Sequence, residues 1–195
     1  DLPICKDLLM ESSNNYSSKQ QHPKLSLSAI KQKLQYRQHH AAQYFRCAVK
    51  LDRIKDSTAT FSRGGDVIGL IMATRCNINP AGPSALEQSH DAAGKILIIH
   101  AFCIDKAYQK KGIGKRMLSN YVESIKTMRL RNGIDKLVVR VNETWLMIWL
   151  VQKLHFSVQT YYPDQQCYQC ELNLNLLGSE DSKRKGLSYW VVDSF

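Results

Sequence analysis

The stretch ILIIHAFCIDKAYQKKGIGKRM, residues 96–117, decides how this chain folds. Its apolar first half is typical of a buried strand, and apolar residues at helical spacing from Met117 to Met128 predict a helix. Between the two lies a basic turn with Gly112 and Gly114. Glycines let backbone N–H groups turn toward one point, and a helix N-terminus adds unpaired N–H groups and partial positive charge. The turn thus has the properties of an anion-binding site, although a plain strand-to-helix turn with basic neighbours has the same spacing.

Two common phosphate-binding loops do not match this turn. A Walker A loop needs G-x-x-x-x-G-K-[ST], but Gln109 stands in place of its first glycine and Arg116 in place of its Ser or Thr. A dinucleotide-binding G-x-G-x-x-G fingerprint fails at Met117, which occupies the place of the third glycine. What remains is Q-K-K-G-I-G-K, residues 109–115, with lysines on both sides of the glycines.

The rest of the chain predicts a single mixed α/β domain, because strands are followed by a strand–helix–strand crossover and then by a helix and two strands. The expected helices are a first one ending near Glu11 and others over 25–41, 113–132 and 145–154. The expected strands cover 44–50, 67–75, 95–105, 136–141, 156–162 and 167–176.

The composition limits the classes of partner. The net charge is +10, which allows nucleic acid, a membrane surface or a phosphorylated cofactor as an anionic partner. No membrane span is expected, because the longest strongly apolar run, residues 145–151, is far shorter than the roughly 20 residues that cross a bilayer. The first residues do not read as a signal peptide.

The six cysteines show no framework spacing, which indicates a reducing, cytoplasmic setting. Cys167 and Cys170 form a C-x-x-C, but they lie in an alternating stretch in which residues three apart point to opposite faces. A structural zinc site needs a second pair of ligands, and the chain has no second C-x-x-C. We therefore expect no metal.

The turn Q-K-K-G-I-G-K, placed after a strand, resembles the Q/R-x-x-G-x-G/A loop of the GNAT acetyltransferases, which cradles the pyrophosphate of coenzyme A. The resemblance is closest to the arylalkylamine and polyamine N-acetyltransferase branch, including a histidine ahead of the loop, and it covers roughly residues 1–177. It implies that the first strand is missing or replaced and that residues 178–195 form a tail. The supporting segments, in chain order, are DLP with its helix, VIGLIMAT, HAFCIDKAYQKKGIGKRMLSNYVESI, KLVVRVNE and LHF.

The resemblance implies a mixed, mostly antiparallel sheet, flanked by helices and splayed at a cleft that takes acetyl-CoA as co-substrate. It assigns the pantetheine arm to backbone groups of Phe102, Cys103 and Ile104, with the Cys103 N–H as an oxyanion donor. Asn142, after the next strand, is a further candidate for a cofactor contact. The pyrophosphate would be held by amides of Lys110, Lys111, Gly112, Ile113, Gly114 and Lys115.

The implied reaction is acetyl transfer to a primary amine by direct attack in a ternary complex. His100 occupies the position of the catalytic histidine of this branch, which acts through waters. A histidine in an apolar run is more commonly a core residue satisfied by backbone, and that alternative stays open. A small amine or polyamine is favoured as acceptor, and a peptide or protein amine comes second.

Two features depart from the family pattern. The family has a tyrosine that protonates the leaving thiolate. Val151 takes its place when the positions are counted from Phe156, and Trp149 takes its place when they are counted from Asn142. Water, Tyr161 or Tyr162 are the candidate substitutes. The branch has a Phe-Pro-x-x-Glu-like substrate loop after its first helix. The corresponding stretch of this chain, NNYSSKQ at residues 14–20, has a tyrosine but neither the proline nor the glutamate, which weakens the case for a small aromatic amine.

An acetyltransferase has two rivals. One is a CoA-binding module with little catalysis, which fits the missing tyrosine. The other is a nucleic-acid binder that uses the basic surface, but the sequence has no recognisable helix-turn-helix, RRM or zinc-finger signature. We therefore expect an acetyl-CoA-dependent N-acetyltransferase and no nucleic-acid partner.

Overall fold

A computed structural model describes residues 27–51, 65–77 and 89–175 of the 195-residue chain. In chain order its helices and strands are α2 (Leu27–His40), β1 (Phe45–Leu51), β2 (Gly65–Cys76), β3 (Ile96–Ile104), α3 (Ile113–Asn132), β4 (Lys136–Val141), α4 (Thr144–Leu154), β5 (Ser157–Tyr162) and β6 (Cys167–Asn173). The elements predicted within these ranges are confirmed, with ends that move by a few residues. The predicted first helix and the tail, 178–195, lie outside the described residues.

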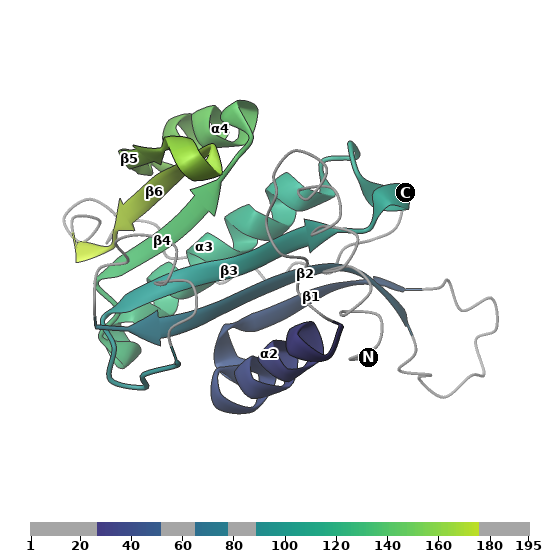
Figure 1. The fold of residues 1–195 in the computed structure, drawn as a ribbon, viewed down its shortest axis with the longest axis horizontal. Coiled ribbons are helices and arrows are strands. Elements are labelled where there is room, and N and C mark those ends of the chain that lie inside the picture. The colour runs from purple at the N-terminus through teal and green to yellow at the C-terminus, as the bar shows by residue number, and fades with distance from the viewer. Residues whose placement is uncertain (1–26, 52–64, 78–88, 176–195) are drawn as a thin grey trace.

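The described strands form one six-stranded sheet in the order β1-β2-β3-β4-β6-β5 (Figure 1). Strands β3 and β4 are parallel, whereas all other neighbouring pairs in this sheet are antiparallel. A parallel pair needs a long crossover connection, and helix α3 supplies it. The predicted mixed, mostly antiparallel α/β fold is thus confirmed.

Helices cover both faces of this sheet. Helix α3 presents a stripe of buried residues to the main core, where it packs on alternate residues of the central strands, and α4 adds Leu150 and Leu154 to the same core. Helix α2 lies on the opposite face, where Leu34 packs against Leu70 and Met72 of β2 (Figure 1). We call these the α3 face and the α2 face of the sheet.

The pairing of β3 with β4 is short. It runs from Ile96 opposite Lys136 to Ile99 opposite Val139 and then ends. Residues Ala101–Ile104 continue the strand but pair only with β2 among the described strands. The two strands diverge beyond this point (Figure 1), which confirms the predicted splay.

Candidate functional site

The glycine turn ends at the N-terminus of α3, and the structure leaves the first backbone amides of that helix without a side-chain cap. Gly112 is the N-cap residue, with φ +78° in the left-handed region, and it has no side chain with which to cap the helix. The first turn of the helix begins with the hydrogen bond from the Arg116 N–H to the Gly112 carbonyl, at 3.1 Å. The amides of residues 113–115 therefore precede the ladder of the helix, as an anion site requires.

The two glycines of the turn serve different purposes. A Cβ atom on Gly112 would meet nothing within 4 Å, so this position opens onto free space. A Cβ atom on Gly114 would lie 3.3 Å from Phe102 Cζ and 3.4 Å from Ile104 Cγ1. Gly114 thus lets the first turn of α3 approach the end of β3 closely.

Side chains of the connection between β3 and α3 hold the turn in shape. Gln109 Nε2 donates to the Ile104 carbonyl at 2.8 Å, and Asp105 Oδ1 accepts from the Ala107 N–H at 2.8 Å. The Asp105 N–H donates to the carbonyl of Ile68 on β2 at 2.9 Å. The turn is therefore anchored to two strands before any ligand arrives.

Positive charge surrounds this anchored turn. Five basic side chains of the turn and the first helical turn are exposed: Lys106, Lys110, Lys111, Lys115 and Arg116. Lys111 Nζ lies 5.2 Å from the centre of the Tyr108 ring, and Lys115 Nζ lies 5.9 and 6.0 Å from the rings of Trp145 and Trp149 on α4. An anion at the helix N-terminus would thus meet cations on two sides.

The structure places His100 on the α2 face, beside the point where β3 and β4 part. Its Nε2 atom lies 2.5 Å from Oγ1 of the buried Thr74 on β2. The ring is half-buried. Because Thr74 fixes the rotation of the imidazole, the ring is held in one orientation at the splay.

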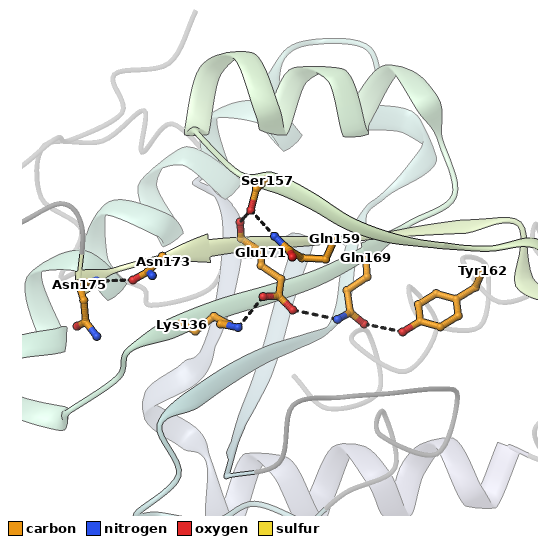
Figure 2. Close-up of polar contacts among 8 residues, drawn as sticks. All are labelled: Lys136, Ser157, Gln159, Tyr162, Gln169, Glu171, Asn173 and Asn175. Atoms are coloured by element: carbon orange, nitrogen blue, oxygen red, sulfur yellow. Dashed lines mark hydrogen bonds and ion pairs between the residues drawn. The ribbon is translucent and has the colours of Figure 1, made fainter.

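A polar layer extends the α2 face across β4, β6 and the end of β5 (Figure 2). Lys136 Nζ pairs with Glu171 Oε2 at 2.6 Å, and Gln169 Nε2 donates to Glu171 Oε1 at 3.0 Å. The Tyr162 hydroxyl donates to Gln169 Oε1 at 3.3 Å. Arg140 Nη2 also lies 3.3 Å from Gln169 Oε1, and its guanidinium stacks over the Tyr162 ring at 4.7 Å. This layer is built into the sheet, since Gln169 and Glu171 are buried.

The structure also places the residues that stand where the family has its acidic tyrosine. Val151 is exposed on α4, and Trp149 packs partly against the main core. Tyr161 stacks on Tyr168 with ring centres 4.8 Å apart, whereas Tyr162 joins the polar layer. The two tyrosines thus have different surroundings.

Three parts of this site were missed by the sequence reading. They are Thr74 against His100, the polar layer around Arg140 and Gln169, and the lysine that joins α3 to the tryptophans of α4. For the first two parts, the available signal was a set of polar residues within strands that otherwise read as buried. Asn142, which was predicted, follows β4 and donates to the Gln165 carbonyl at 3.4 Å.

The cysteine pair at β6 is buried. Burial raises the pKa of the Cys170 thiol to about 11, and it also raises the pKa of Cys167, where the positive charge of Arg140 opposes it. Thiols with raised pKa values stay protonated at neutral pH, and metals bind the thiolate. Within residues 27–51, 65–77 and 89–175, no three His, Cys, Asp or Glu side chains come together in a way that would hold a metal ion. Nor is any helix in these ranges long and apolar enough to span a membrane.

Comparison with known proteins places this geometry in a family. No curated protein matches the sequence. Among solved structures, yncA from Salmonella typhimurium, with its cofactor acetyl-CoA, superposes with a TM-score of 0.56 at 16% identity, covering 89% of this chain and 90% of that one.

Two further structures share the fold. PH1933 from Pyrococcus horikoshii has a TM-score of 0.54 at 16% identity, covering 88% of this chain and 89% of its own. The NatC complex bound to Gag peptide and CoA gives 0.53 at 13% identity, with coverage of 88% and 89%. The sequence model of the acetyltransferase (GNAT) family matches residues 24–147, which is more than half of the chain. The protein therefore belongs to the GNAT family of acetyl-CoA-dependent acetyltransferases.

Proposed function

We propose that this protein transfers the acetyl group of acetyl-CoA to a primary amine by direct attack in a ternary complex. One observation carries the proposal: the half of β3 that β4 leaves unpaired leads, through the turn of residues 105–112, to the uncapped N-terminus of α3. This places an extended backbone edge and an anion site end to end. A coenzyme with a peptide-like arm joined to a pyrophosphate has that same order of groups.

The residues present fit coenzyme A. The amides of residues 110–115 would hold the pyrophosphate, because the Gly112 position is open and no side chain caps the helix. The open edge of β3 at Phe102 and Ile104 would pair with the pantetheine arm, and Asn142 would contact the same arm from the end of β4. When bound, acetyl-CoA would supply the acetyl thioester, and these residues would hold the thioester in place for attack.

The alternation of strand β3 refines which amides face that arm. The Asp105 N–H points to β2, because it donates to Ile68. Backbone groups two residues apart in a strand point the same way, so those of Cys103 also face β2. We therefore assign the oxyanion donor to the N–H of Phe102 or Ile104, on the open side, rather than to that of Cys103.

His100 is the base in this proposal. A primary amine has a pKa near 10.4, so presenting it unprotonated at pH 7 costs roughly 4–5 kcal/mol. His100 lies at the splay, where Thr74 Oγ1 holds Nε2 and the Nδ1 atom is buried, so the amine proton would reach the ring through the Thr74 hydroxyl or a water rather than directly. It lies on the α2 face, opposite α3, so the amine would approach from the side away from the pyrophosphate site.

The charges of the polar layer favour some acceptor amines over others. Its carboxylate, Glu171, is 6% exposed and is neutralised by Lys136, while Arg140 adds positive charge. A polyamine would therefore find little attraction in this layer, and we place a small monoamine first. A peptide amine is the second candidate, in line with the peptide carried by the structurally similar NatC complex.

The experiment is acetyl-CoA binding by calorimetry, followed by thiol release with spermine, tryptamine, a peptide with a free N-terminus and a lysine peptide. Binding with thiol release from one amine supports the proposal and names the acceptor class. Binding without release from any of them would favour a CoA-binding module, as the aliphatic Val151 also does. Absence of binding would refute the proposal.

A second experiment tests the base. We expect His100→Ala to lower the rate of transfer about 100-fold near neutral pH while acetyl-CoA affinity stays unchanged. His39→Ala, on the exposed surface of α2, is the matched control and should keep full activity. A variant of His100 with an unaltered pH–rate profile would return this histidine to a purely structural role.

Two other expectations stay predictions. The domain is expected to span residues 1–177, with 178–195 as a tail, and limited proteolysis with mass spectrometry tests that boundary. The cytoplasmic location rests on cysteine spacing, and imaging of the tagged full chain tests it.

A further inference from the structure

An aromatic and basic cluster beside the glycine turn has no part in the chemistry above. Trp145 lies in the first turn of α4, and 56% of its surface is exposed. Trp149 follows one helical turn later, on the same side of the helix. Lys115 reaches across from α3 and lies about 6 Å from both rings. Trp145 also adjoins the exposed Ile148 and Val151 of the same helix, and contiguous exposed apolar patches often mark binding sites.

The position of this cluster limits its ligand. Lys115 is the third residue of α3, so its backbone amide belongs to the anion site while its side chain contacts the tryptophans. Trp145 is thus within one side chain of the proposed pyrophosphate position. The pantetheine arm would leave that position along the edge of β3 that β4 leaves open, whereas the exposed indole lies on the surface.

We propose that Trp145 stacks on the adenine base at the nucleotide end of coenzyme A, and that Lys115 links this base site to the phosphate site. The inference rests on the proposed coenzyme. An indole offers a π-face to a purine, and such stacking is worth about 1–3 kcal/mol by alanine substitution, or roughly 5- to 150-fold in affinity.

Charge supports this occupant. The nucleotide end of coenzyme A carries a 3′-phosphate as well as the pyrophosphate, and the exposed Lys110, Lys111 and Arg116 surround the turn next to Lys115. The lysine over both rings also restrains the indole of Trp145 before the ligand arrives. A partner protein seated on the apolar stripe of α4 would instead need Ile148 and Val151, which are exposed on the same helix.

The test measures equilibrium binding of three probes by calorimetry: coenzyme A, adenosine 3′,5′-bisphosphate and 4′-phosphopantetheine. Trp145→Ala should weaken the first two about tenfold and leave the third unchanged. Trp145→Phe keeps an aromatic face and should recover most of the affinity. Ile148→Ala, which removes an exposed apolar side chain from the same helix, is the matched control and should bind all three like the wild type.

Fluorescence gives an independent signal. The chain has three tryptophans, Trp145, Trp149 and Trp190, and adenine stacking quenches an indole. Adenosine 3′,5′-bisphosphate should quench the wild type, and Trp145→Phe should lose most of that quenching. 5′-AMP should bind more weakly than the bisphosphate, because it lacks the 3′-phosphate.

The outcomes separate this inference from the proposed function. Normal coenzyme A affinity in Trp145→Ala would refute the base site and leave the acetyltransferase proposal standing. Equal weakening of 4′-phosphopantetheine would also refute it, because Trp145 would then contact the pantetheine arm. A change of oligomeric state in Ile148→Ala and Trp145→Ala, with binding intact, would assign the stripe to a second chain. If the wild type does not bind coenzyme A, the proposed function itself is refuted.

Discussion

The two ends of helix α3 are built differently. At its C-terminus, Gly133 closes the helix in the left-handed conformation, with its N–H donating to the Arg129 carbonyl at 2.8 Å. The guanidinium of Arg75, which is 6% exposed, donates to the Asn132 carbonyl at 2.6 Å. At its N-terminus, Gly112 has the same left-handed conformation and provides no cap. One end is thus satisfied by the protein, whereas the other is left for a ligand.

The difference follows from the helix dipole. The C-terminus carries partial negative charge, and a buried arginine stabilises it. Arg75 also donates from Nε to the Gly94 carbonyl at 2.6 Å and lies 3.5 Å from the Tyr44 hydroxyl, so it joins the helix end to the start of β3. The N-terminus carries partial positive charge, and an anionic ligand would stabilise it in the same way. A binding site can therefore be recognised as the helix end that the fold leaves unsatisfied.

The strongest test places a negative charge at the open end. Gly112→Glu should abolish acetyl-CoA binding, because a carboxylate would occupy the space beside the amides and repel the pyrophosphate. Calorimetry measures the loss. Gly133→Glu is the matched control, since it adds the same charge at a second glycine of positive φ, at the closed end, and it should bind acetyl-CoA normally. Equal binding by both variants would contradict the assignment of the open end.

The next test removes the guanidinium that satisfies the C-terminal end of α3. Arg75→Met keeps an apolar stem of similar length but removes the donors to Gly94 and Asn132. Leaving buried carbonyls without donors should lower the free energy of unfolding by about 3 kcal/mol, as measured by urea denaturation. Arg131→Met, on the exposed side of the same helix end, should change it by less than about 0.5 kcal/mol. A small effect of Arg75→Met would mean that water replaces its hydrogen bonds.

The open end could be predicted from the sequence, because its signal is local. Gly112 and Gly114 stand between a strand and a helix within one short segment, and periodicity located both elements. The splay followed from the family resemblance rather than from any residue. The faces of the strands were also predictable where apolar and polar residues alternate, as from Gln169 to Leu172 in β6.

The closed end and the acceptor side were missed because their contacts join residues that are far apart in the sequence. Arg75 contacts Asn132, 57 residues away, and Thr74 contacts His100, 26 residues away. In the sequence Arg75 ends an apolar strand and reads as a surface charge. Such pairs depend on strand register and helix position, which periodicity does not fix.

A gentler pair of variants compares the two glycines directly. Both have positive φ, and a Cβ atom on either would meet nothing within 4 Å. Gly112→Ala and Gly133→Ala should therefore each lower the free energy of unfolding by about 1 kcal/mol through backbone strain alone. Only Gly112→Ala should also weaken acetyl-CoA binding, because its strain displaces the amides of the open end. Parallel denaturation and calorimetry of the two variants check this, and weaker binding in Gly133→Ala would show that the ends are coupled.

The smallest expected effect lies in the turn that Arg75 anchors. His90 Nδ1 accepts the backbone N–H of Arg75 at 3.2 Å. Burial, then the charge of Arg75 and a smaller effect of His40, lowers the pKa of His90 below its usual 6.5, while Asp91 opposes the shift. The unfolded chain therefore binds this proton at a higher pH than the folded protein does. This stabilising contribution is complete above pH 6.5 and declines as the pH falls below it.

We therefore expect the free energy of unfolding of the wild type to fall between pH 7 and pH 5 more steeply than that of His90→Gln, which keeps an acceptor but does not titrate. Urea denaturation at each pH measures the two slopes, and His39→Gln, exposed on α2, should behave like the wild type. Identical slopes for His90→Gln and the wild type would show that His90 binds its proton equally well in both states. Because His90 contacts Arg75 at the closed end of α3, replacing it should leave acetyl-CoA affinity unchanged at every pH. A substitution at the open end would change that affinity.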